Sequence, residues 1–114
     1  MAKDSRLGGR PRARINAQVR ARTDHPLCPM CGHPINRQAK RTGRRHPLAS
    51  VVDEWVPRSK GGPVTLANCV EMHSACNAIK SDHWPITTEL RDRCTEEVER
   101  ELNPGVGELT RSPW

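Results

Sequence analysis

The sequence predicts a small α+β domain stabilised by a bound metal ion. The chain has 114 residues, which is enough for one domain and short for two. Hydrophobic residues make up only 34% of it, and neither Phe nor Tyr occurs, so the core is thin and needs additional support. Two pairs of potential metal ligands, Cys28 with Cys31 and His73 with Cys76, lie on either side of a strand-like segment. A metal ion bound by these side chains would supply that support.

The first half of the chain contains one helical and one extended pattern. Residues 1–9 are charged and end in glycine, which is typical of a disordered basic tail. A basic helix is expected within residues 10–24, because Pro11 suits a first helical position and apolar residues four apart share one face. Residues 51–56 are mostly β-branched or aromatic and predict a strand. A glycine-rich turn over residues 60–63 follows it.

The second half predicts a return strand and two helices. Residues 66–72 fit a loop with a short return strand, and residues 73–80 fit a helix. A C-terminal helix is expected within residues 85–103, mainly over 88–102, because apolar residues recur there every four positions on one face. Residues 104–114 are interpreted as a flexible tail.

The two ligand pairs favour a structural zinc ion. Three sulfurs and one imidazole suit tetrahedral Zn²⁺, and a site whose ligands all come from protein leaves no position open for water. The zinc ion would stabilise a unit of residues 25–84. The alternative to a zinc site is a set of unrelated buried thiols. Cys69 and Cys94 have no partner at ligand spacing and are expected to pack as small apolar residues. His33 follows Cys31 too closely to complete the tetrahedron.

The positive charge is concentrated at one end of the chain. Residues 1–45 contain twelve Lys and Arg against two acidic residues, whereas residues 46–114 contain seven against eleven. This asymmetry favours a polyanion, and DNA in particular, as the partner, although a solvated basic tail is the alternative. The cations that we assign to phosphate contacts are Arg10, Arg12, Arg14, Arg20, Arg22, Arg44, Arg45, Lys60 and Lys80.

The composition also indicates a cytoplasmic protein. No apolar run approaches the about 20 residues that cross a bilayer, so no membrane partner is expected. The N-terminus has no apolar segment of the kind that marks a secretory signal. Five cysteines are an odd number, which fits a metal site with spare reduced thiols better than a set of disulfides.

Several polar residues remain that the fold does not require. Asp53 and Glu54 are adjacent in the expected strand, so their side chains point to opposite faces unless the strand bends. Asn77 lies in the expected helix, and Asn68 lies in the loop before it. A hard cation such as Mg²⁺ would accept Asp53 and the amide oxygen of Asn77 while retaining waters for a phosphate.

These motifs, in this order, resemble those of the HNH (His-Asn-His) endonucleases, particularly the short zinc-bearing forms common among actinobacteria and their phages. The resemblance covers roughly residues 10–84. The segments that carry it are CPMCGHPI at 28–35, HPLASVVDE at 46–54, VPRSKGG at 56–62, Asn68, HSACN at 73–77, and Lys80. The basic run before Cys28 is also similar to the lead-in helix of that family.

The resemblance implies a ββα-metal fold of treble-clef-like form, in which a β-hairpin and a helix surround one divalent cation. It implies that Asp53 and Asn77 bind a catalytic Mg²⁺ or Mn²⁺. It also implies that Asn68 holds the loop and orients the general base, and that Lys80 lies near the phosphate. His46 matches a His-Pro segment of the family but receives no chemical role.

The sequence departs from the family at position 54, where glutamate replaces the histidine that serves as the general base. A carboxylate is a weaker base than imidazole near neutral pH, and it adds negative charge where a phosphate must approach. Two interpretations follow. Glu54 activates the attacking water itself, aided by burial and by the neighbouring Asp53, or Glu54 binds the metal and leaves the protein slow or inactive as a nuclease.

The function expected from the sequence is a metal-dependent DNA endonuclease that hydrolyses phosphodiester bonds. The alternative is a catalytically silent, zinc-stapled DNA-binding module, which needs only the four zinc ligands and the basic arm. A third interpretation is an adaptor whose acidic C-terminal helix docks a partner protein or forms a homodimer. A phage origin would suggest a packaging component as partner, within the cytoplasm of a bacterial host.

Overall fold

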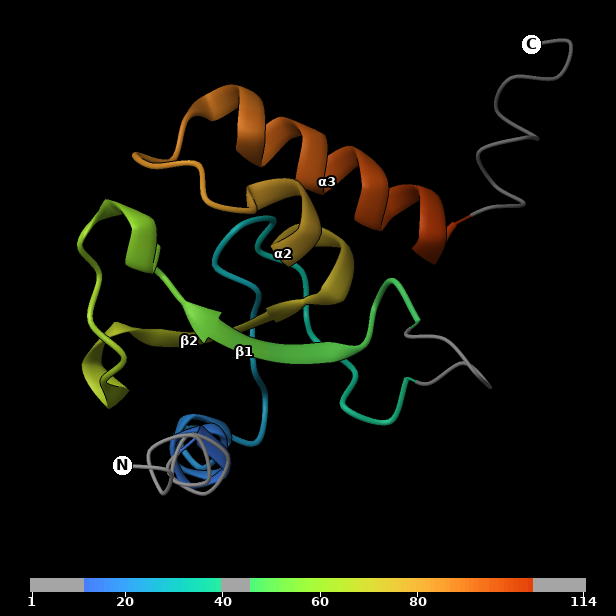
Figure 1. Cartoon of the computed structure of the whole chain (residues 1–114). Helices are drawn as coiled ribbons and strands as arrows, with labels where there is room; N and C mark the ends of the chain where they lie inside the picture. Colours follow the sequence, from blue (N-terminus) through green and yellow to red (C-terminus); the bar gives the residue numbers. More distant parts are fainter. Residues whose placement is uncertain (1–11, 40–45, 104–114) are drawn as a thin grey trace, which may run out of the picture.

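The computed structural model describes residues 12–39 and 46–103 as a small α+β domain (Figure 1). Within that part, the N-terminal helix covers residues 12–20, α2 covers Ser74–Lys80 and α3 covers Thr88–Leu102. A two-stranded antiparallel sheet lies between them. The predictions that fall outside the described residues are the tails at 1–9 and 104–114 and the three arginines Arg10, Arg44 and Arg45.

The sheet separates two packing layers. Strand β1 (Ser50–Glu54) pairs with β2 (Cys69–His73), so that Val51 lies opposite Met72 and Glu54 opposite Cys69. Residues directly opposite one another share a face of the sheet. Val51 and Met72 therefore pack with α2 and α3, whereas Cys69 packs with the N-terminal helix. Figure 1 shows this helix on the opposite side of the sheet from α2 and α3.

Strand β1 is shorter than the expected segment of residues 51–56. The backbone N–H of Trp55 donates to the Asn68 carbonyl at 2.7 Å, and the N–H of Val56 donates to Asn68 Oδ1 at 3.0 Å. A side-chain oxygen thus replaces the next ladder acceptor, and β1 ends at Glu54. The strand thus ends directly after Asp53 and Glu54, the residues to which the sequence assigns chemistry, and the chain bends at residues 55–56.

Helix α3 forms where the apolar spacing predicts it. The side chain of Thr87 caps the helix by accepting a bond from the N–H of Leu90 at 3.2 Å. Leu90, Cys94 and Val98 are buried in the main core, as the four-residue spacing requires. Leu102, the next residue in the series, is 46% exposed because the helix ends there.

Among the described residues, no helix is both long and apolar enough to cross a bilayer.

Gly62 closes the loop after β1 and leaves no room for a side chain. A Cβ atom at this position would lie 1.8 Å from the Val56 carbonyl oxygen and 2.9 Å from Asn68 Nδ2. Gly62→Ala is therefore expected to lower the free energy of unfolding by about 3 kcal/mol, through forced movement of the backbone. Urea unfolding of the zinc-loaded protein measures this loss.

Gly61→Ala is the matched control for this loop. Gly61 has φ of 90°, but an added Cβ atom would have no neighbour within 4 Å. Its cost is therefore limited to the strain of the left-handed backbone, about 1 kcal/mol. Equal losses in the two variants would contradict a steric origin for the effect at Gly62.

Candidate metal centre and acidic cleft

The structure brings the four predicted zinc ligands together. Their ligand atoms all lie within 4.8 Å of one another, and the four residues are Cys28, Cys31, His73 and Cys76. His73 Nδ1 lies 3.3 Å from Cys31 Sγ and 3.8 Å from Cys76 Sγ. A tetrahedral zinc with bonds of about 2.3 Å to sulfur and about 2.0 Å to nitrogen separates these atoms by about 3.6 Å. The observed spacing therefore fits a zinc ion.

Different local structures present the two ligand pairs. Cys28 and Cys31 lie in a tight turn that closes with a bond from the Gly32 N–H to the Cys28 carbonyl at 2.7 Å, and Gly32 takes the φ of 79° that this turn needs. His73 is the last residue of β2 and precedes α2, whereas Cys76 lies in the first turn of α2. The helix expected over residues 73–80 thus begins one residue later, at Ser74.

A backbone carbonyl orients the imidazole of His73. His73 Nε2 lies 3.0 Å from the Pro34 carbonyl oxygen, which can only accept, so Nε2 carries the proton and Nδ1 faces the sulfurs. Such a second contact is typical of histidines that bind metals. Burial lowers the pKa of His73, but hydrogen bonds to the Cys28 and Cys31 sulfurs outweigh it and raise the pKa to about 10.

The thiols of the cluster have strongly perturbed proton affinities. Hydrogen bonds from Cys31 and then Cys76 move the pKa of Cys28 far below its ordinary value. The pKa of Cys76 is raised, first by its hydrogen bonds to Cys28 and Cys31. Three thiols and an imidazole crowded in this way favour a thiolate, which is the form that binds zinc.

The remaining cysteines and His33 lie where the sequence places them, outside the cluster. Cys69 and Cys94 are each 0% exposed, the first beneath the N-terminal helix and the second in the main core. His33 Nε2 instead lies 3.0 Å from a carboxylate oxygen of Glu99. This contact joins the turn of Cys28 and Cys31 to α3, as does the bond from Arg91 to the Pro29 carbonyl at 2.6 Å.

A second group of polar side chains lines a cleft at the end of β1. The cleft has a volume of about 430 Å³, and its walls include Asp53 and Glu54 from β1 and Asn77 from α2. Arg58 and Ser59 from the following loop and Asp82 complete much of its rim. The structure therefore brings together three of the four residues to which the sequence assigns the chemistry.

Asn68, the fourth of these residues, lies behind the cleft and holds its loop. Its Nδ2 donates to the Val56 carbonyl at 3.0 Å and to the Pro63 carbonyl at 2.8 Å, while its Oδ1 accepts from the Val56 N–H. These bonds satisfy backbone groups on both sides of the loop. Asn68 thus fixes the backbone immediately after Glu54.

An arginine from the N-terminal helix forms ion pairs with both Asp53 and Glu54. Arg12 Nη1 donates to Glu54 Oε2, and Arg12 Nη2 lies 3.3 Å from Asp53 Oδ1 and 3.0 Å from the Val52 carbonyl oxygen. The Glu54 side chain is only 10% exposed in this contact, whereas that of Asp53 is 40% exposed. Burial lowers the pKa of Arg12, but the hydrogen bond and charge of Glu54 outweigh it and raise the pKa above its ordinary value. Arg12 is therefore charged.

Lys80 does not lie at an exposed phosphate position, in contrast to the assignment made from the sequence. It is 1% exposed, with Nζ 3.4 Å from the Glu54 carbonyl oxygen and 5.7 Å from the centre of the Trp55 ring. Burial lowers the pKa of Lys80, although the charges of Asp53, Glu54 and Asp82 oppose this. The ammonium group therefore contacts the end of β1 from inside the domain, through the Glu54 carbonyl and the Trp55 ring.

Most of the described arginines expected to contact phosphates contact the protein instead. Arg20 donates to the Ser50 hydroxyl at 3.0 Å, and Arg22 donates to the Cys69 and Leu66 carbonyls at 2.9 and 2.7 Å. The sequence predicts a weakly docked basic helix that lies along phosphates. The structure shows a helix whose guanidinium groups satisfy sheet carbonyls and carboxylates, which leaves Arg14 and Lys60 exposed.

The sequence gives no direct signal for the ion pair at the centre of this docking. Glu71 of β2 is 7% exposed and accepts two bonds from Arg37, at 2.8 and 2.9 Å. It also accepts from the Ser50 hydroxyl at 2.7 Å. The one signal in the sequence is an acidic residue within an otherwise apolar strand, because a buried carboxylate needs a charged partner.

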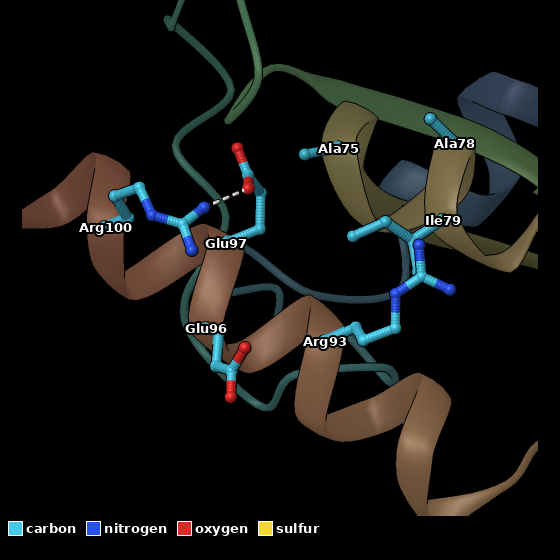
Figure 2. Close-up of a pocket in the computed structure, with 7 residues that line it drawn as sticks. All are labelled: Ala75, Ala78, Ile79, Arg93, Glu96, Glu97 and Arg100. Atoms are coloured by element: carbon cyan, nitrogen blue, oxygen red, sulfur yellow. Dashed lines mark hydrogen bonds and ion pairs between the residues drawn. The ribbon is translucent and has the colours of Figure 1, made fainter.

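A separate hollow of about 390 Å³ lies between α2 and α3 (Figure 2). Ala75, Ala78 and Ile79 line one side of it, and four charged residues of α3 line the other. Two of these, Glu97 and Arg100, pair with each other. Its charges are mixed, so this hollow offers no net field for a polyanion. Ala78 of α2 lines both this hollow and the acidic cleft.

Comparison of the chain with protein-family models, with curated proteins and with solved structures found no match.

Proposed function

We propose that this chain is a metal-dependent DNA endonuclease of the HNH type, with a zinc-stapled ββα-metal domain of treble-clef-like form. The observation that carries the proposal is the meeting of Asp53, Glu54 and Asn77 in one cleft. Asp53 and Glu54 end β1 and Asn77 lies in α2, and the cluster that fits zinc adjoins both β2 and α2. Hard oxygen donors in a polar cleft suit Mg²⁺ or Mn²⁺ rather than zinc.

The donor set of the cleft fits a hydrated divalent cation. The Asp53 side chain is 40% exposed, and among the described residues its hydrogen bonds fall on Oδ1. Its second oxygen and the side-chain amide oxygen of Asn77 are thus the candidate ligands, with water filling the other positions. A cation held there would neutralise charge on the phosphate and on the leaving oxygen.

Glu54 is the candidate base of the reaction. Its carboxylate would accept a proton from the attacking water as a new bond forms between the water oxygen and phosphorus. The bond from phosphorus to the 3′ oxygen then breaks, and that oxygen takes a proton from solvent. Asn68 and the buried Lys80 fix the backbone of residue 54 from both sides and so act as positioning residues.

Three exposed cations are the candidate DNA contacts. Arg58 lines the cleft, and Lys60 and Arg14 are exposed on the loop and on the N-terminal helix. Contacts of this kind bind the phosphate backbone without reading sequence, so the affinity for DNA should fall steeply with salt.

Incubation of supercoiled plasmid with the zinc-loaded protein tests this function. We expect relaxation that requires added Mg²⁺ or Mn²⁺ and that falls by at least about 10²-fold in Asp53→Ala and Glu54→Ala. The baseline is the same protein without added cation, since EDTA would also remove structural zinc. Ser59→Ala, at the rim of the cleft and without an assigned role, is the matched control. Relaxation that persists in Asp53→Ala would contradict this active site.

The contact of Arg12 with Glu54 favours a second candidate, the catalytically silent DNA-binding module. A carboxylate that is bonded to a guanidinium group is not available as a base. This candidate predicts retardation of plasmid on a gel with no relaxation under any divalent cation. Relaxation by Glu54→His alone would show that the chain is a nuclease scaffold silenced at position 54.

A further inference from the structure

Arg12 already occupies the position of a cation between the two carboxylates. Its two terminal nitrogens reach Glu54 Oε2 and Asp53 Oδ1, and the second also bonds the Val52 carbonyl. Three acceptors at the end of β1 thus converge on one guanidinium group. Its side chain is 29% exposed, so it is accessible from solvent at this position.

A divalent cation and Arg12 compete for the same charge. Both require Asp53, and the guanidinium group would lie within a few ångströms of any ion bound between Asp53 and Asn77. Like charges at that distance repel each other, and the repulsion is larger where water is partly excluded. The contact therefore lowers the affinity of the cleft for a second cation and, at the same time, occupies Glu54.

The attachment of the N-terminal helix is strongest at the end distant from Arg12. Val19, 3% exposed, packs beneath the sheet, and Arg20 and Arg22 bond Ser50 and Cys69. Arg37 adds a bond of 2.8 Å to the Arg20 carbonyl. Arg12 can therefore leave the acidic pair by local movement of the first helical turn, while the rest of the helix stays attached.

We propose that the Arg12 contact is autoinhibitory and that DNA phosphates release it. A phosphate accepts the same paired hydrogen bonds from guanidinium as a carboxylate does, and the exposed Arg14, Arg58 and Lys60 would bring phosphates close to Arg12. Release exposes both carboxylates, so that the divalent cation binds and Glu54 becomes available only when DNA is present. This inference rests on the proposed divalent-cation site.

Titration of the zinc-loaded full chain with Mn²⁺, followed by the loss of the EPR signal of free Mn²⁺, tests the proposal without any activity assay. Without DNA, we expect Arg12→Gln to bind Mn²⁺ about 10-fold more tightly than the wild type. Arg93→Gln removes the same charge from an exposed position of α3, outside the cleft, and should bind Mn²⁺ as the wild type does. Zinc content and circular dichroism check that each variant is folded.

The second arm uses the unmodified chain and a short DNA duplex. The duplex should tighten Mn²⁺ binding by the wild type toward the affinity of Arg12→Gln and change that variant much less. Asp53→Asn with the same duplex measures the Mn²⁺ that DNA and other sites bind, and this amount is subtracted. Unchanged Mn²⁺ binding by the wild type on addition of the duplex would overturn the release of Arg12, and this comparison does not need the Arg12 variant.

The outcomes separate the inference from the function on which it rests. Equal Mn²⁺ affinities of the wild type and Arg12→Gln, both lost in Asp53→Asn, would overturn the autoinhibitory contact and leave the cation site in place. An equal gain in Arg93→Gln would also overturn it, since the effect would then be one of total charge. Absence of Asp53-dependent binding in every protein, with and without duplex, would overturn the cation site and the contact together.

Discussion

We expect the four-residue cluster to hold zinc, and we expect loss of that ion to unfold the domain. Structural zinc contributes about 10–16 kcal/mol of apparent binding free energy, whereas a domain of this size is stable by about 5–15 kcal/mol in total. Two of the ligands, Cys28 and Cys76, are 1% and 0% exposed and form part of the main core. Cys28→Ser should therefore remove both a zinc ligand and the closure of the core.

Far-UV circular dichroism, combined with zinc analysis, measures this effect before and after chelation. Cys94→Ala is the matched control, because Cys94 is equally buried in the same core but lies outside the ligand set. It should retain zinc and lose only about 1–2 kcal/mol of stability through the cavity that it creates. Cooperative unfolding of Cys28→Ser at wild-type urea concentrations, without zinc, would contradict the assignment.

Arg37→Ala is expected to cost about 3–5 kcal/mol, because it leaves the carboxylate of Glu71 buried without its main partner. Glu71 is 7% exposed, and Arg37 donates two hydrogen bonds to its carboxylate, whereas Arg20 Nε lies farther away, 3.8 Å from Glu71 Oε2. Arg37 also bonds the carbonyls of Arg20 and Thr23, so the change loosens the docking of the N-terminal helix. Urea unfolding of the zinc-loaded protein measures the loss.

Arg100→Ala is the matched control for this prediction. It removes the same charge from an ion pair with Glu97 on the exposed face of α3, where the arginine side chain is 62% exposed. Surface pairs of this kind contribute at most about 1 kcal/mol. A cost of Arg37→Ala no larger than that of Arg100→Ala would show that Glu71 is solvated in solution.

The same ion pair predicts a dependence of stability on pH. Burial raises the pKa of Glu71, but the hydrogen bonds from Arg37 and Ser50 outweigh it and hold the pKa below its ordinary value. The charged form is thus favoured in the folded state. Its contribution is fully present above the unfolded-state pKa of about 4.3 and is lost as the pH falls through the lower folded-state pKa. The stability difference between the wild type and Glu71→Gln should narrow below about pH 4.

The cluster of four ligands that fits zinc could be predicted from the sequence because metal ligands are set by residue type and local spacing. Cys28 and Cys31 face one ion through a turn of the chain, and His73 and Cys76 do so through the strand-to-helix junction. Three sulfurs and an imidazole in such pairs are typical of a tetrahedral zinc site. The extent of α3 follows from the same kind of local information, because buried residues recur there every four positions.

The acidic cleft could be anticipated only in part. The order of the motifs indicates that Asp53, Glu54 and Asn77 belong to one site, and the structure places them around one cleft. The end of β1 at Glu54 depends on Asn68, whose side-chain oxygen accepts from the Val56 N–H, twelve residues away. The burial of Lys80 over the Trp55 ring also depends on contacts between segments that are distant in the sequence.

Local pattern thus determined the ligand set, the order of the elements and the excess of positive charge at the N-terminus. The tertiary structure alone decided which partners those charges meet. Arg12, Arg20 and Arg22 contact groups 30 to 47 residues away, and no periodicity in the sequence encodes such pairs. The physical reason is that a long charged side chain bonds the acceptors that tertiary packing places near it. Packing of Val19 against the sheet places backbone carbonyls and carboxylates within reach of these arginines, so they bond the protein rather than a phosphate.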